Sequence, residues 1–228
     1  MNPARPITVL LADDHRIVRE GLRKLLESES DIEVVGEAAT GRQAVEITAR
    51  LRPDVVVMDI AMPRLNGLEA ARRILETDPA ARVLVLSAHS DDAYVEKVME
   101  LGAAGYLIKQ TSARCLAEAV REVRKGKPYF SPSVARQRGR LRRETLDRRG
   151  RSRAGKVRLT PRETEVLQLV AEGAANKQVA GELGISVKTV EKHRNSLMRK
   201  LDIHDTASLT RYAIAAGVIE SNVQLTIL

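Results

Sequence analysis

The 228-residue sequence has one cysteine, no tryptophan and few other aromatic residues. Cys115 alone cannot form an internal disulfide, and the scattered histidines do not complete a zinc site around it. With aromatic residues at 2%, recognition of single strands by base stacking is disfavoured. The longest apolar run near the N-terminus, Ile7 to Ala12, is too short for a membrane span or a signal-peptide core. We therefore expect a cytoplasmic protein with no membrane partner.

The net charge of +8 is concentrated in one short segment. Residues 1–130 contain 19 basic and 20 acidic side chains, and residues 159–228 contain 8 of each. Residues 131–158 contain 11 basic and 2 acidic side chains and almost no large apolar ones. The pattern predicts two domains, 1–130 and 159–228, joined by a basic linker that includes a short charged helix around Val134–Leu146.

The first 130 residues alternate short apolar runs with longer amphipathic stretches. The runs are rich in Val, Ile and Leu without polar alternation, which is typical of strands buried on both faces. The predicted strands are Thr8–Leu11, Val34–Val35, Val55–Met58, Val83–Leu86 and Tyr106–Ile108. Five strand–helix repeats predict an α/β fold with a five-stranded parallel sheet, whose functional residues lie at the carboxyl ends of the strands.

Polar side chains follow four of these five strands. They are Asp13 and Asp14 after the first strand, Asp59 after the third, Ser87 after the fourth and Lys109 after the fifth. Three carboxylates in one crevice repel each other unless a cation neutralises them, and Mg²⁺ suits such oxygen ligands. With the charge screened, Asp59 is able to attack a phosphoryl group and become an aspartyl phosphate. Each residue alone is better explained as a turn, cap or surface residue, but their shared position at the strand ends favours a site.

Residues 5–127 resemble the receiver domains of response regulators. The matching segments are Leu11-Ala12-Asp13-Asp14-His15, Met58-Asp59-Ile60-Ala61-Met62-Pro63, Leu86-Ser87-Ala88 and Gly105-Tyr106-Leu107-Ile108-Lys109. The resemblance implies a flavodoxin-like fold in which a sensor histidine kinase phosphorylates Asp59. It also implies that Asp14, Asp59 and the Ala61 carbonyl ligate Mg²⁺, while Asp13 acts mainly through water.

The resemblance further assigns the signalling residues. Ser87 would hydrogen-bond the phosphoryl group, Lys109 would pair with it, and Tyr106 would swing inward when Ser87 moves. Such a domain is a phosphoacceptor with at most weak self-phosphorylation and self-dephosphorylation, and not an enzyme in its own right.

Residues 159–228 are predicted to be a small all-α domain. Thr160, Pro161 and Glu163 form the sequence of a capping box with proline at the first helical position. We expect four helices: one from Pro161 to about Gly173, a second over Asn176–Leu183, a third from the Ser186 cap to about Leu201, and a fourth from Asp205 to Gly217.

The third of these helices has one polar and one mostly apolar side. The polar residues are Lys188, Glu191, Lys192, Asn195 and Arg199. Cations suit phosphates, and Glu and Asn can recognise base edges in the major groove. A solvated amphipathic helix explains the same pattern equally well. The short helix before it, followed by Gly184-Ile185-Ser186, favours a helix-turn-helix.

Residues 159–219 resemble the LuxR-type helix-turn-helix of the NarL/FixJ group of response regulators. The matching motifs are Leu159-Thr160-Pro161-Arg162-Glu163, Glu165-Val166-Leu167, Gly184-Ile185-Ser186, Thr189-Val190 and His193. The resemblance implies that Glu191, Lys192 and Asn195 reach bases. It places Thr189, His193 and Arg199 against the DNA backbone. The fourth helix, with Leu209, Tyr212, Ala213 and Ala216, would supply a dimer contact on DNA.

The two resemblances together predict a transcription factor in which phosphorylation of Asp59 controls dimerisation and binding to double-stranded DNA. One alternative is a phosphatase of the haloacid dehalogenase kind, but such enzymes need a second carboxylate two residues after the nucleophile, where this chain has Ala61. The other alternative is an RNA-binding antiterminator, which the few aromatic residues disfavour.

Overall fold

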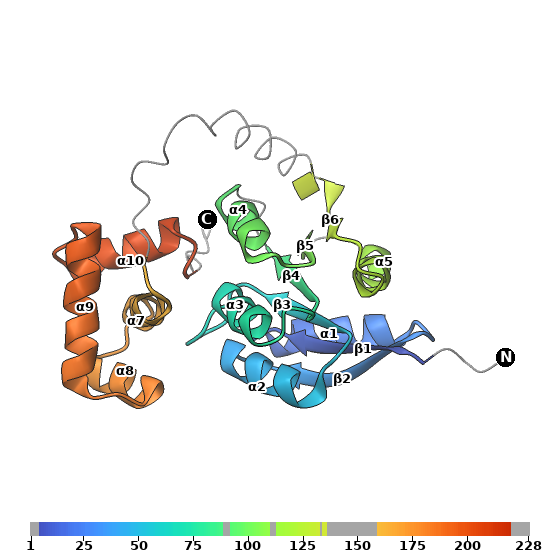
Figure 1. The fold of residues 1–228 in the computed structure, drawn as a ribbon, viewed down its shortest axis with the longest axis horizontal. Helices are drawn as coiled ribbons and strands as arrows, with labels where there is room; N and C mark the ends of the chain where they lie inside the picture. Colours follow the sequence, from blue (N-terminus) through green and yellow to red (C-terminus); the bar gives the residue numbers. More distant parts are fainter. Residues whose placement is uncertain (1–4, 89–91, 110–112, 133, 136–158, 220–228) are drawn as a thin grey trace, which may run out of the picture. The chain divides into compact units, whose positions relative to one another are not determined.

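The computed structural model describes residues 5–88, 92–109, 113–132, 134–135 and 159–219. The chain divides into two compact units, residues 1–152 and 153–228. In Figure 1 the first unit is coloured from blue to yellow-green and the second from orange to red. Most of the predicted basic linker and its helix lies outside the described residues. Within the described ranges, every helix is too short or too polar to cross a bilayer.

The first unit is built on a parallel sheet with the strand order β2-β1-β3-β4-β5-β6. The strands are β1 Ile7–Ala12, β2 Ile32–Ala38, β3 Val55–Asp59, β4 Val83–Ser87, β5 Gly105–Ile108 and β6 Tyr129–Phe130. All five predicted strands are confirmed, but the predicted strand count was one too low. β6 has two residues, with Tyr129 opposite Gly105, and a segment that short gives no recognisable apolar pattern.

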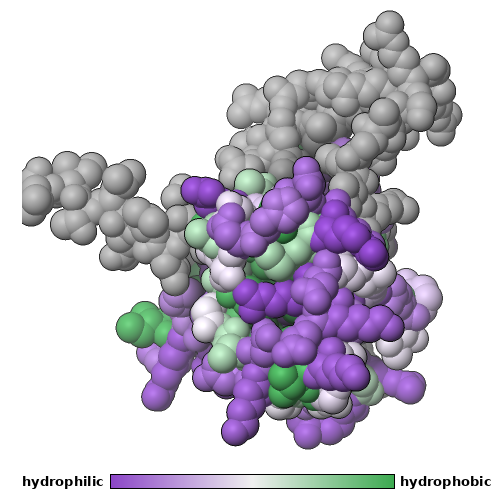
Figure 2. All heavy atoms as spheres, turned by 90° about the vertical axis from the view of Figure 1, so that its left-hand side faces the viewer, coloured by the Kyte–Doolittle hydropathy of each residue, from purple (hydrophilic) through white to green (hydrophobic). Residues whose placement is uncertain are grey.

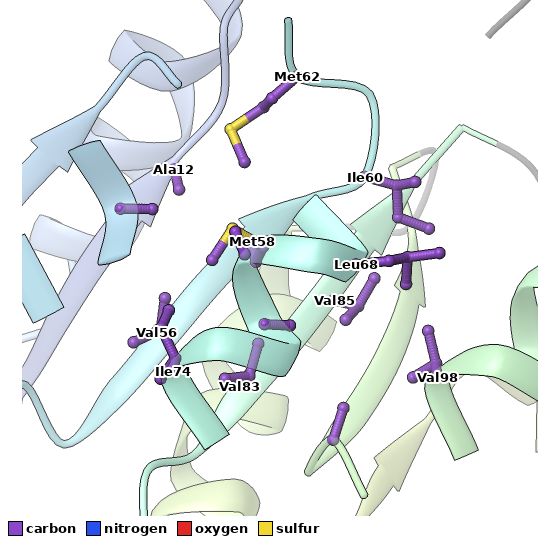
Figure 3. Packing of buried hydrophobic residues seen from close by; sticks show 14 of the residues in the cluster. Ala12, Val56, Met58, Ile60, Met62, Leu68, Ile74, Val83, Val85 and Val98 are labelled. Carbon is purple, nitrogen blue, oxygen red and sulfur yellow. The ribbon is translucent and has the colours of Figure 1, made fainter. Parts of the chain in front are cut away.

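Helices cover both faces of this sheet. They are α1 Arg16–Glu27, α2 Gly41–Leu51, α3 Gly67–Thr77, α4 Asp92–Leu101 and α5 Ala113–Arg124. One apolar core lies between the sheet and α2, α3 and α4, and a second lies between the opposite face and α1 and α5. Figure 3 shows part of the first core, where Val56 and Val83 lie beside Ile74 of α3. The doubly covered α/β fold is therefore confirmed.

The first unit continues beyond residue 130. The Ser131 amide donates a hydrogen bond to the Tyr106 carbonyl (3.0 Å). Val134 is fully buried in the core beside α2, α3 and α4. The first residues of the expected linker therefore pack against the sheet.

The second unit is helical, as predicted. It consists of α7 Pro161–Ala171, α8 Asn176–Leu183, α9 Val187–Leu201 and α10 Thr206–Ala215. Thr160, Ser186 and Asp205 cap α7, α9 and α10 by accepting hydrogen bonds from backbone amides. α8 ends where Gly184 adopts a left-handed conformation with φ of 63°, which glycine tolerates best.

One expectation for α10 was wrong. Leu209 and Ala213 are fully buried in the core of the second unit, so they are not available for a dimer contact. The family resemblance had assigned these two residues to an interface, but they lie on the helical side that packs on the domain's own core. The exposed side of α10 carries Ala207, Arg211 and Ile214.

Candidate functional site

An acidic pocket lies at the carboxyl ends of the central strands. β1 and β3 are neighbours, with Ala12 opposite Met58. Asp13, which follows β1, and Asp59, the last residue of β3, therefore meet at this end of the sheet. Lys109 follows β5 and extends its ammonium group to both carboxylates. Its Nζ lies 2.7 Å from Asp59 Oδ2 and 3.0 Å from Asp13 Oδ2. The structure thus brings together three of the predicted site residues.

Burial makes the charge balance of this pocket important. Asp13 and Asp59 are each only 1% exposed. Burial by itself would lower the pKa of Lys109, but the Asp59 and Asp13 carboxylates outweigh it, and the pKa is raised. Lys109 therefore remains a cation at neutral pH and offsets part of the carboxylate charge.

The donor set of the pocket suits a divalent cation. Ligand atoms of Asp13, Asp14, His15 and Asp59 all lie within 4.8 Å of one another. Three carboxylates are hard oxygen ligands of the kind that Mg²⁺ prefers. An Mg²⁺ ion held by carboxylates keeps further coordination positions for water and phosphate oxygens. His15, whose Nδ1 lies 2.9 Å from Asp14 Oδ1, was not predicted. Ala61 is half-buried in the loop after β3.

Ser87 and Tyr106 lie on adjacent strands beside the pocket. Val85 is opposite Tyr106 and Ser87 is opposite Ile108, and because strand side chains alternate, Ser87 and Tyr106 lie on the same sheet face. Both are fully buried. The Lys109 amide donates to the Ser87 carbonyl (2.7 Å), which joins the ends of β4 and β5.

Sequence reasoning also missed Gly67, which shapes the pocket. A Cβ atom there would lie 1.8 Å from the Asp59 carbonyl oxygen, so only glycine allows α3 to begin this close to β3. The Asn66 side chain caps α3 by accepting a hydrogen bond from the Glu69 amide (2.9 Å). The Asn66-Gly67 pair after Pro63 was the available sequence signal, since Asn caps helices and Gly permits close approach.

A second candidate site is the exposed side of α9. Lys188, Glu191, Lys192, Asn195 and Arg199 are all exposed. They line a shallow depression together with Ser186, Thr189 and Ser196. Figure 2 looks toward this side of the second unit, where hydrophilic residues predominate. Thr189 and His193 are half-buried, and His193 is not among the residues that line the depression.

Glu163 anchors α9 from the start of α7. It accepts hydrogen bonds from Ser196 Oγ (3.0 Å) and Lys200 Nζ (2.8 Å), both on α9, and from the Thr160 amide (2.8 Å). Burial alone would raise the pKa of Glu163, but these donors, Lys200 foremost, lower it to about 2. The sequence indicated only its role in the capping box, which is confirmed.

Arg194 is the one charged residue on the inner side of α9, and its hydrogen bonds explain why it lies there. Its guanidinium donates to Asn176 Oδ1 (3.0 Å) and Thr206 Oγ1 (2.6 Å). It thereby joins the first turns of α8 and α10 to α9. This position is structural, and the exposed polar residues of α9 lie on the opposite side of the helix.

Both units match known protein families. Residues 9–121 match the response regulator receiver domain. Residues 157–213 match the luxR family of bacterial regulatory proteins. The two matches account for most of the described residues of each unit.

Similar proteins have both units in the same order. The chain is 37% identical to the transcriptional regulatory protein DegU of Brevibacillus brevis, over 94% of this chain and 95% of that protein. It is 40% identical to LiaR of Bacillus subtilis, over 91% and 96% of the two chains. A solved structure of two RcsB dimers bound to two parallel DNAs is 29% identical, covers 93% of this chain and 99% of that one, and has a TM-score of 0.56.

Proposed function

The chain belongs to the NarL/FixJ group of response regulator transcription factors, and we propose that Asp59 is its phosphoacceptor. The observation that carries this proposal is the buried contact of Lys109 with both Asp59 and Asp13. A carboxylate at a strand end, beside a fixed cation and further carboxylates, is suited to accept a phosphoryl group.

The pocket residues have different roles in phosphoryl transfer. Asp59 supplies the attacking oxygen, and Lys109, already within hydrogen-bond distance, is placed to stabilise the negative charge on the transferred group. Mg²⁺, when bound, supplies further neutralisation of phosphoryl oxygens. Asp14, Asp59 and the Ala61 carbonyl would hold it directly, and Asp13 mainly through water. The domain is a phosphoacceptor with at most weak self-phosphorylation and self-dephosphorylation. Position 61, where a phosphatase of the haloacid dehalogenase kind needs its second carboxylate, is alanine.

Ser87 and Tyr106 connect the pocket to the rest of the first unit. The hydroxyl of Ser87, at the end of β4, is placed to hydrogen-bond the phosphoryl group. Tyr106 lies on the same sheet face, under α3 and α4. The hydrogen bond between Ser87 and the phosphoryl group exists only when Asp59 is phosphorylated. It therefore stabilises one arrangement of Ser87 and Tyr106 over another and shifts the conformational equilibrium of the first unit.

The exposed side of α9 is the DNA-reading surface in this proposal. Glu191, Lys192 and Asn195 would contact base edges in the major groove. Lys188 and Arg199 are exposed cations suited to phosphates. Thr189, near the start of α9, and His193, near its middle, are half-buried. We assign both to contacts with the DNA backbone.

Phosphorylation by a sensor histidine kinase favours a homodimer, which binds two half-sites of duplex DNA. The RcsB structure, solved as dimers on DNA, supports this assignment. The dimer contact on α10 falls to its exposed side, with Arg211 and Ile214. The duplex-DNA complex also favours this output over RNA-binding antitermination, and the family membership favours it over a phosphatase.

Incubation of the full chain with a small phosphodonor and Mg²⁺ tests the phosphoacceptor. Borohydride reduction and peptide mass spectrometry should map the modification to Asp59, and Asp59→Asn should remove it, because an amide is a poor nucleophile. Asp54→Asn is the control, because Asp54 directly precedes the first residue of β3, at the end of the strand opposite to Asp59. Labelling at another aspartate in the parent protein would contradict the assignment.

A further inference from the structure

Arg19 on α1 connects the acidic pocket to the neighbouring strand β2. Its Nη1 donates a 2.6 Å hydrogen bond to the main-chain carbonyl oxygen of Asp13. Its Nε donates a 2.8 Å hydrogen bond to Glu37 Oε2 on β2. The Arg19 side chain is 14% exposed, so both contacts are largely shielded from water.

The loop that Arg19 contacts is also held by its own amides: the Asp13 amide donates to the Ala38 carbonyl (3.0 Å), and the His15 amide donates to Asp13 Oδ1 (2.8 Å). His15 occupies the N-cap position of α1 but makes no side-chain capping hydrogen bond. The first turn of α1 is closed when the Arg19 amide donates to the His15 carbonyl (3.0 Å). The backbone of Arg19 thus fixes one end of the loop and its guanidinium fixes the other, at Asp13. Asp13 is thus one of the two anchored residues, and Asp14 lies between them.

The positive charge of the Arg19 guanidinium is offset by the neighbouring Glu37 carboxylate. Glu37 also accepts a 2.5 Å hydrogen bond from Arg23 Nε. The hydrogen bond from Arg19 is the largest cause that lowers the pKa of Glu37, so this carboxylate is ionised at neutral pH. With an ionised partner at hydrogen-bond distance, the guanidinium repels a nearby metal ion less. What remains is a directional contact that holds the Asp13 backbone.

We propose that Arg19 is a positioning residue for the divalent cation site, holding the Asp13–Asp14 loop in the conformation that binds Mg²⁺. This inference rests on the proposed function, because the cation is the one that accompanies phosphorylation of Asp59. Outer groups that orient metal ligands commonly change metal affinity by about 10–100-fold when they are removed. Arg19 contacts the backbone of Asp13, which acts on the ion mainly through water and directly precedes the ligand Asp14, so the lower end of that range is expected.

A positioning role and a purely electrostatic role predict opposite results. Removing a cation near a metal site strengthens Mg²⁺ binding if charge repulsion dominates. Removing a residue that orders the ligands weakens it. Arg19→Gln therefore distinguishes the two, and Arg19→Lys adds a second comparison, because it keeps the charge but loses the planar two-pronged geometry.

The experiment measures the dissociation constant for Mg²⁺ alone by titration calorimetry on the full chain, together with the thermal unfolding midpoint. Arg23→Gln is the matched control, since Arg23 shares Glu37 and lies one turn along the same helix, while Asp13 is not among its hydrogen-bond partners in the described residues. We expect Arg19→Gln and Arg19→Lys to weaken Mg²⁺ binding about tenfold and Arg23→Gln to change it less than about twofold.

The outcomes separate this inference from the proposed function. Unchanged or tighter Mg²⁺ binding by both Arg19 variants, or equal weakening by Arg23→Gln, would overturn the positioning role alone. Should Arg19→Gln fail to fold, the Arg19→Lys result decides. A parent protein that binds no Mg²⁺ and accepts no phosphate would overturn the proposed function and this inference with it.

Discussion

Replacing Glu163 with glutamine removes the carboxylate through which α7 anchors α9. The ordinary carboxyl pKa of 4.5 is lowered to about 2 in the folded unit. At about 1.4 kcal/mol per pKa unit, this difference is worth roughly 3 kcal/mol of stability. Glutamine retains a carbonyl that can accept one hydrogen bond, and Lys200 is 35% exposed. We therefore expect Glu163→Gln to lower the unfolding free energy of the second unit by about 2 kcal/mol at pH 7.

The same carboxylate makes this stability dependent on pH. A group whose pKa is lower in the folded state stabilises the fold above its unfolded pKa. Its contribution here is complete above about pH 4.5 and is lost as the pH falls through about 2. The parent second unit should therefore lose stability across this window, and Glu163→Gln should lose much less of it.

Amide hydrogen exchange on the full chain measures the two units separately. Exchange of the α7 and α9 amides should accelerate in Glu163→Gln, while exchange of the β1 and β3 amides should stay unchanged. Glu191→Gln is the control, because Glu191 is an exposed glutamate on α9. Equal acceleration in both variants, or none in Glu163→Gln, would refute the anchoring role and the pH dependence derived from it.

Three further predictions concern signalling and DNA. Ser87→Ala should leave Asp59 able to accept phosphate but reduce the phosphate-driven dimerisation seen by sedimentation; equal dimerisation in variant and parent contradicts the switch role. Lys192→Ala and Asn195→Ala should each relax base preference at a cost of about 1–3 kcal/mol in site selection, unless another surface reads the bases. Five arginines of the basic segment 131–158, which lie outside the described residues, should add about −0.9 per phosphate contact to the slope of log affinity against log salt. Changing them to glutamine should flatten that slope without changing the preferred sequence, and an unchanged slope indicates a charged tether only. These arginines are Arg140, Arg142, Arg143, Arg148 and Arg149.

Local sequence patterns predicted the elements of both units well, because each depends on nearby residues. The α8 helix begins and ends at the predicted residues, Asn176 and Leu183, since Gly184 stops it. Ser186 and Asp205 cap the helices that they were expected to start. The two-residue strand β6 was missed because its stability comes from pairing with β5 and not from its own composition.

The acidic pocket was predicted in its membership but not in its supports. Asp13, Asp59 and Lys109 could be placed together because parallel strands end at one edge of the sheet. Gly67 and Arg19 could not, since their importance depends on tertiary approach: Gly67 abuts the Asp59 carbonyl, and Arg19 reaches back to the Asp13 carbonyl. The resemblance assigned Leu209 and Ala213 of α10 to a dimer contact, but both are buried in the core of the second unit. An apolar helical side does not by itself reveal whether it faces the core or a partner.

We propose that phosphate on Asp59 controls DNA binding by the second unit. The most direct test of this control measures the affinity of the full chain for a duplex selected from random fragments, before and after treatment with a small phosphodonor and Mg²⁺. A coupling free energy of about 1–3 kcal/mol, typical of linked sites, tightens binding roughly 5–150-fold. We predict this tightening in the parent protein and its absence in Asp59→Asn. Equal affinity of the parent protein with and without phosphate, or tightening that persists in Asp59→Asn, would contradict the account.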